Sequence, residues 1–394
     1  MKEHNPNLDY YSFPIEKNES IVVSPDEEKN KEQSAPAPAP STPEQAAEKP
    51  PHAAADVQTR ERKAKLAFSR IGLAVVLMIV VWLGLNFAIG MVATIVKPEL
   101  LSDATFLMFS STLPLILVAI PVAYLVMRVM PRVTPAPQKP IGGAKFTVLI
   151  FMSLGIMIAG NLLSTVLLSF FQSLTGIVPM NSLDIITSAP LWAIMLCTVI
   201  LSPIFEEILC RKIILTRLLP YGEGTAIIFT SIIFACIHGN LFQFFYAFGI
   251  GVLLALLYIR TGRLRYCITL HIIINALGSL VTVALISNMD PALVEFFMEG
   301  STELIADADA MMRLIFDNFT PVFLLFQYIF LEYGAAIAGI ILLIAGIHRI
   351  KIVRKNTDVP VSRSLVLGGS SVGGIFLILT SIVLTILNMG LIGG

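Results

Sequence analysis

Long apolar runs recur from residue 66 to the C-terminal part of the chain. Runs of about eighteen or more such residues are long enough to cross the roughly 30 Å hydrocarbon core of a bilayer. The pattern predicts an all-α polytopic membrane protein with about eight to nine transmembrane helices. Nine candidate spans can be placed, at about 66–96, 104–130, 146–175, 190–219, 223–239, 241–260, 265–287, 320–347 and 366–391.

The first part of the chain has a different character from the apolar body. Residues 1–63 hold more than a third of all charged side chains and include the run Ala35-Pro36-Ala37-Pro38-Ala39-Pro40. Such a segment has too little apolar surface to offset the entropy lost on folding. We therefore expect a disordered tail over 1–63, for which the Pro-Ala run could serve as a semi-rigid spacer.

The loops between the spans predict the orientation, because Lys and Arg accumulate on the cytoplasmic side of membrane proteins. Basic residues precede the first span and fill every second loop after it, whereas the 288–320 loop is acidic apart from Arg313. An odd number of spans then places the N-terminus in the cytoplasm and the C-terminus outside. The expected location is the cell membrane, with multiple passes.

The overall charge of the chain argues against nucleic acid as a partner. Lys and Arg number 27, equal to Asp and Glu, and charged residues make up only 14% of the chain. No basic patch suggests nucleic acid, so the expected partners are the lipid bilayer and a substrate in or near it. The four cysteines lie in or beside apolar spans without metal-ligand spacing, which favours a packing role.

Ionisable groups inside a span cost at least about 2.5 kcal/mol at mid-depth, so each marks a functional or paired structural residue. The fourth span contains Glu206, Glu207 and Arg211, the fifth contains Phe234 and ends at His238, and the seventh contains His271 and Asn275. A hairpin of the fourth and fifth spans brings Glu206 and His238 to similar depth. We expect these residues to form one polar cluster.

The two adjacent glutamates allow different interpretations. Glu207 and Arg211 are four residues apart, so they can form a structural ion pair on one helix face. Glu206 is rotated by about 100° from Glu207 and lacks an evident cation. It is therefore a candidate general base, although a buried, protonated structural glutamate remains an alternative.

A carboxylate, two histidines and an asparagine are a set suited to hydrolysis. The carboxylate can take a proton from water, histidine can orient that water, and asparagine can donate to an oxyanion. The alternative is a Zn²⁺ site held by Glu206, His238 and His271. No HExxH helix is present, so no metal cofactor is required by the sequence.

These residues are also where the chain resembles a known family, the CPBP intramembrane proteases, also called the Abi or type II CAAX prenyl endopeptidase family. Its motifs EExxxR, FxxxH and HxxxN stand in order as Glu206-Glu207…Arg211, Phe234…His238 and His271…Asn275. The resemblance covers about 140–290. It implies that Glu206 and His238 activate water and that His271 and Asn275 bind the carbonyl or its oxyanion. Glu207, Arg211 and Phe234 would support the site.

With this resemblance, the chain divides into five parts: a disordered cytoplasmic tail (1–63), N-terminal transmembrane helices (64–140), a CPBP-like catalytic core (141–290), an acidic extracytoplasmic loop (291–319) and C-terminal transmembrane helices (320–394).

The predicted function is an intramembrane endopeptidase acting on a CAAX-type C-terminus or a peptide leader. The alternatives are a non-catalytic bacteriocin-immunity or membrane binding module and a proton-coupled transporter. Two further residues stand out, Glu332 as another intramembrane acid and Pro203 as a kink before Glu206.

Overall fold

The computed structural model describes residues 51–138, 140–176, 188–294, 308–348, 350–353 and 358–388. Every regular element in these residues is helical. The predicted all-α architecture is therefore confirmed for the part of the chain that the structure describes. Most of the predicted tail, residues 1–50, lies outside it, as do 295–307 of the acidic loop and 389–394.

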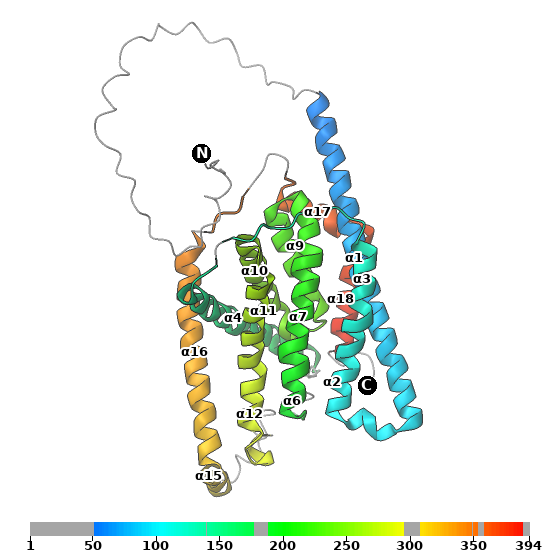
Figure 1. Cartoon of the computed structure of the whole chain (residues 1–394). Helices are drawn as coiled ribbons and strands as arrows, with labels where there is room; N and C mark the ends of the chain where they lie inside the picture. The colour runs from blue at the N-terminus through cyan, green and yellow to red at the C-terminus, as the bar shows by residue number, and fades with distance from the viewer. Residues whose placement is uncertain are drawn as a thin grey trace, which may run out of the picture.

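The helices pack together as a bundle (Figure 1). In the N-terminal part these are α1 (Pro51–Val96), η1 (Pro98–Ser102), α2 (Ala104–Pro114), η2 (Leu115–Ala119), α3 (Ile120–Met127) and α4 (Gly143–Thr175). The next long helix is made of α6 (Leu191–Ile194), η3 (Met195–Leu201), α7 (Ser202–Glu207), η4 (Ile208–Leu215), α8 (Thr216–Leu218) and η5 (Leu219–Tyr221).

Nine further elements precede or follow the acidic segment in the described residues. Before it come α9 (Glu223–Ile237), α10 (Leu241–Thr261), α11 (Leu264–Asn275), η6 (Ala276–Val281) and α12 (Thr282–Ile286). After it come α15 (Ala308–Asp317), α16 (Phe319–Ile347), α17 (Val361–Gly369) and α18 (Val372–Asn388). Two of these boundaries differ from expectation: α1 begins at Pro51, before the predicted boundary at residue 64, and α15 is a helix within the expected 291–319 loop.

The described residues contain fewer candidate spans than the nine placed on the sequence, although the higher count agrees with the lower end of the predicted eight to nine. Among the described residues, seven helices are long and apolar enough to cross a bilayer, or eight if α17 and α18 form one broken span. These two helices meet at a bend of 76°, within the predicted ninth span. The predicted fifth span is α9, which has 15 residues. At 1.5 Å per residue it is about 22 Å long, shorter than the hydrocarbon core.

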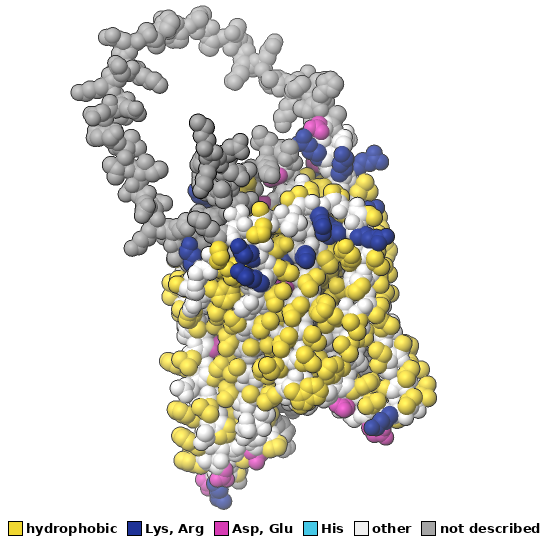
Figure 2. Space-filling view, viewed as in Figure 1, with side chains coloured by type: hydrophobic (Ala, Val, Ile, Leu, Met, Phe, Trp, Pro, Cys, Tyr) yellow, Lys and Arg dark blue, Asp and Glu magenta, His cyan; other side chains and the backbone are white. Residues whose placement is uncertain are grey.

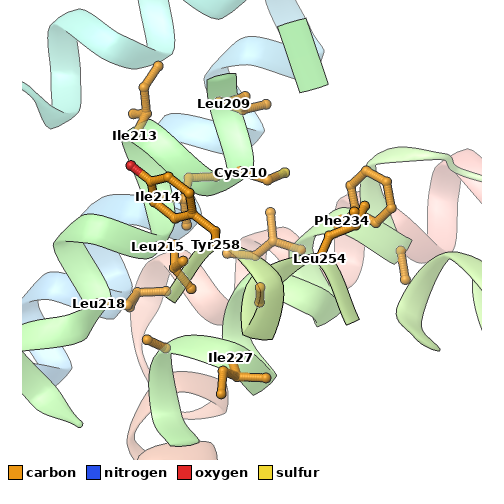
Figure 3. Close-up of a cluster of buried hydrophobic side chains, with 14 of the residues drawn as sticks. Leu209, Cys210, Ile213, Ile214, Leu215, Leu218, Ile227, Phe234, Leu254 and Tyr258 are labelled. Atoms are coloured by element: carbon orange, nitrogen blue, oxygen red, sulfur yellow. The ribbon is translucent and has the colours of Figure 1, made fainter. Parts of the chain in front are cut away.

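Burial explains why α9 is apolar although it is short. Most of its residues are buried, and it packs against η4, α10 and α17. Its hydrophobic side chains therefore contact other helices rather than lipid. Figure 3 shows part of the resulting core, a cluster that includes Leu209 and Ile214 of η4, Ile227 and Phe234 of α9 and Leu254 of α10.

Glycines allow the long helices to cross closely. Figure 1 shows α4 running obliquely across α10 and α16, and both helices pack against it. A Cβ atom on Gly339 of α16 would lie 1.8 Å from the carbonyl oxygen of Phe151, and one on Gly160 would lie 2.5 Å from the Tyr246 backbone. Small residues at such crossings are typical of membrane helices, which associate mainly through close packing.

Charged side chains lie at the two ends of the bundle (Figure 2). Lys and Arg gather at the end that carries α17 and the first turns of α1, whereas acidic groups lie at the opposite end, around α15. At the basic end, Arg363 of α17 makes two hydrogen bonds to Glu61 of α1, at 2.9 and 2.7 Å. A buried ion pair joins Arg260 and Glu223 at the same end, between α10 and α9.

Candidate active site

The helix that carries the two glutamates is not a regular α-helix. The six residues of α7 lie between two π-helical segments, η3 and η4. Pro203, near the start of α7, has no N–H and cannot continue the normal hydrogen-bond ladder. Membrane helices tolerate such breaks where neighbouring helices cover the backbone, and π-helical turns are frequent at functional sites.

Glu207 is a buried junction between two helices. Its side chain is fully buried, and its Oε2 accepts a hydrogen bond from Nε of Arg211 at 2.9 Å. Its Oε1 lies 3.1 Å from Nδ1 of His271, on α11. Because a carboxylate only accepts, Nδ1 of His271 carries a proton and donates it. The predicted Glu207–Arg211 pair is confirmed as a contact, and His271 extends it across 64 residues of sequence.

Glu206 is placed differently from its neighbour. Its Oε1 accepts a hydrogen bond from Oγ of Ser202 at 2.7 Å, and its Oε2 lies 3.8 Å from Nε2 of His271. The Glu206 side chain keeps 17% of its surface exposed, whereas that of Glu207 keeps none. Of the two carboxylates, Glu206 is therefore the one that water can reach.

The ring of Phe234, on α9, contacts three of the polar side chains of the site. Its ring makes edge contacts with the rings of His238 and His271, with centroids 5.0 and 5.7 Å apart. The guanidinium of Arg211 lies over the same ring at 5.3 Å. Phe234 is itself buried, and its ring packs against both imidazoles and the guanidinium of Arg211.

His238 lies at the turn between α9 and α10. Its Nδ1 is 2.7 Å from the carbonyl oxygen of Phe234, which can only accept, so Nδ1 donates and Nε2 keeps its lone pair. The turn needs Gly239, whose φ is +62°. Asn240 then caps α10 by accepting from the Gln243 amide, and its Nδ2 donates to the His238 carbonyl at 3.0 Å.

Asn275 ends α11 and reaches the helix that carries the glutamates. Its Nδ2 donates to the carbonyl oxygen of Thr198, in η3, at 3.0 Å. Since an amide nitrogen has two hydrogens, this bond orients the side chain and leaves one N–H for another acceptor. Ser279, in the following η6, donates to the Asn275 carbonyl.

The seven site residues of the sequence analysis thus lie on four connected helical segments. Direct contacts join Glu206, Glu207, Arg211 and His271, Phe234 links His238 to them, and Asn275 is attached to the same helix through Thr198. Sequence reasoning missed Ser202 and Asn240. Ser202 stands four residues before Glu206, the spacing used for Glu207 and Arg211, and Asn240 is a typical N-cap residue.

The described residues contain no group of three or more His, Cys, Asp or Glu side chains placed to hold a metal ion. In particular, the predicted alternative ligands Glu206, His238 and His271 do not form such a group. Both histidines use Nδ1 for a protein acceptor, so each would offer only Nε2 to any ligand.

The comparisons with known proteins bear on this same part of the chain. A family model described as type II CAAX prenyl endopeptidase Rce1-like matches residues 188–277. These residues form an Rce1-like domain. It includes all seven site residues, and the predicted membership of the CPBP family, a protease family, is confirmed over this range. Searches of curated proteins and of solved structures returned no match for the chain.

Proposed function

We propose that the protein is an intramembrane endopeptidase in which Glu206 activates the water that attacks a peptide bond. The observation that carries this proposal is the contrast between the two glutamates. Both oxygens of Glu207 accept hydrogen bonds, one from Arg211 and one from His271. Glu206 is partly exposed, and its Oε2 faces His271. The Rce1-like domain supports hydrolysis of a peptide bond rather than another use of a buried carboxylate.

The reaction follows from the donors and acceptors present. Glu206 takes a proton from water while the hydroxide adds to the carbonyl carbon, and Nε2 of His238 accepts a hydrogen bond from that water. The oxyanion is stabilised by the second Nδ2 hydrogen of Asn275 and by His271, whose ring Glu207 orients through Nδ1. Glu206 then gives its proton to the leaving amine as the C–N bond breaks.

The depth of Glu206 indicates where the scissile bond must lie. Fifteen residues separate Glu206 from each end of the helical segment Leu191–Tyr221. At 1.5 Å per residue this is at most about 22 Å on either side, so Glu206 lies midway along a segment long enough to cross the bilayer. The substrate is therefore a segment that enters the membrane, such as a CAAX-type C-terminus or a peptide leader.

The proposed setting is the cell membrane with the N-terminus in the cytoplasm. The basic end of the bundle, visible in Figure 2, supports this orientation because positive residues are retained on the cytoplasmic side. The five-part division of the chain, with 141–290 as the catalytic core, fits the same proposal, since the Rce1-like match falls inside that core.

The test compares new peptide termini in cells that express wild type or Glu206→Gln at matched levels. A matched control is Glu332→Gln, which makes the same chemical change midway along α16, outside the Rce1-like domain. We expect a set of termini in wild-type and Glu332→Gln cells that is absent with Glu206→Gln. Identical termini in all three, in a host with the natural substrates, would refute proteolysis and favour a binding or immunity module.

A further inference from the structure

Two π-helical segments among the described residues end two residues before a proline. In η2 the amide of Ile120 donates five residues back, to Leu115, and Pro121 follows. In η3 the amide of Ser202 donates five residues back, to Cys197, and Pro203 follows. A proline ring clashes with the carbonyl four residues earlier, and a widened turn relieves that clash. The prolines therefore favour a widened turn at both positions.

The turn before Pro203 leaves one carbonyl without a partner in its own helix. In an α-helix the Thr198 oxygen would accept from the Ser202 amide, but that amide is bound to Cys197. In a π-helix it would accept from residue 203, and proline has no N–H. The donor that reaches the Thr198 oxygen is instead Nδ2 of Asn275, at 3.0 Å.

The same turn also sets the direction in which the glutamates point. A π-helical turn holds one residue more than an α-helical turn, so the residues after it are rotated by about 100° relative to those before it. Glu206 and Glu207 follow directly in α7. Without the widened turn they would present different faces to α11, or the first part of the helix would have to rotate.

We propose that Pro203 is a positioning residue of the site: it keeps the Thr198 carbonyl open for Asn275, and so joins the helix that carries Glu206 to the helix that carries His271. The effect on turnover rests on the proposed protease function, whereas the contact itself does not. Proline at this position therefore stabilises a contact between helices at the expense of the regularity of its own helix.

The first test is a double-mutant cycle of Pro203→Ala and Asn275→Ala, measured by thermal unfolding of the full chain in lipid nanodiscs at one scan rate. In wild type, Asn275→Ala removes the partner of a partly buried carbonyl and should lower the unfolding temperature. In Pro203→Ala the restored amide can satisfy Thr198 within the helix, so Asn275→Ala should have no such effect. An equal decrease in both backgrounds would overturn the proposal.

Pro121→Ala is the matched control, because it restores an amide after η2, outside the Rce1-like domain. The decrease caused by Asn275→Ala should be unchanged in this background. Pro203→Ala alone should fold at least as well as wild type, since a regular helical hydrogen bond returns. A Pro203→Ala chain that fails to fold would also contradict the proposal.

The second test measures cleavage of the membrane substrate identified from the new termini. Pro203→Ala should lower kcat/KM about tenfold or more, because a small misplacement of catalytic groups is costly, and Pro121→Ala should not. Full activity of Pro203→Ala would overturn the role in positioning. Failure of the protease function itself would appear as undiminished cleavage by Glu206→Gln, and the unfolding cycle would still decide the contact.

Discussion

Nδ1 of His271 donates to Oε1 of Glu207 at 3.1 Å, while Arg211 donates to the other oxygen of the same carboxylate at 2.9 Å. Each oxygen of Glu207 thus accepts one hydrogen bond, from its own helix or from α11, whereas Oε2 of Glu206 lies 3.8 Å from Nε2 of His271. Two adjacent residues of the same type have different environments because the helix turns by about 100° between them. One supports the site and the other is available for chemistry.

The stability of this junction can be tested at Glu207. Glu207→Ala should destabilise the protein by about 3–5 kcal/mol, because it leaves the fully buried Arg211 without its carboxylate. Adding Arg211→Met, which removes the unpaired charge, should recover much of the loss. The free energy of unfolding in detergent measures both effects. A single mutant as stable as wild type would show that Arg211 does not depend on Glu207.

A second prediction concerns Ser202, which donates to Oε1 of Glu206 at 2.7 Å. Ser202→Ala should reduce kcat about ten- to a hundredfold, since a hydrogen bond to a charged group contributes about 1.5–3 kcal/mol. KM should change little, because the bond orients the base rather than the substrate. Ser202→Thr retains the hydroxyl and serves as the control. Equal kcat values for Ser202→Ala and wild type would remove Ser202 from the mechanism.

The sequence was sufficient to predict contacts that depend on short-range periodicity. Glu207 and Arg211 stand four residues apart on one helix, and their ion pair follows from that spacing alone. The apolar pattern also predicted an all-helical membrane protein. It placed a ninth span because apolar residues also pack against other helices, and α9 is a short, buried helix of this kind.

Contacts between helices were harder to predict. The bond of Asn275 to Thr198 depends on the widened turn η3, which a pattern of 3.6 residues per turn does not contain. The bond of His271 to Glu207 depends on how α11 is rotated against α7. Both are set by packing in three dimensions, so the sequence could indicate which residues gather but not which atoms meet.

A third prediction addresses metal. We expect protein purified under mild conditions to carry well below one Zn²⁺ per chain, and chelation to leave cleavage unchanged. The reason is the arrangement of donors: among the described residues no three His, Cys, Asp or Glu side chains are placed to share an ion. Elemental analysis of wild type and Glu206→Gln measures this. One zinc per chain in wild type that is lost in the mutant would contradict it.

The last prediction uses two glycines of α16 that differ only in what surrounds them. A Cβ on Gly339 would lie 1.8 Å from the Phe151 oxygen of α4, whereas one on Gly334 would meet nothing within 4 Å. Gly339→Ala should therefore force the helices apart and cost about 1–3 kcal/mol or more. Gly334→Ala should stabilise the helix by about 0.5–1 kcal/mol. Unfolding temperatures of the two variants measure this difference.

The same pair of variants tests whether α16 supports the site. Tyr328 of α16 donates from its hydroxyl to the carbonyl oxygen of Leu277, in the η6 segment that follows Asn275. If Gly339→Ala displaces α16, that bond should weaken, and cleavage should fall together with stability. Gly334→Ala should leave cleavage unchanged. Full activity of a destabilised Gly339→Ala chain would show that η6 keeps its place without α16.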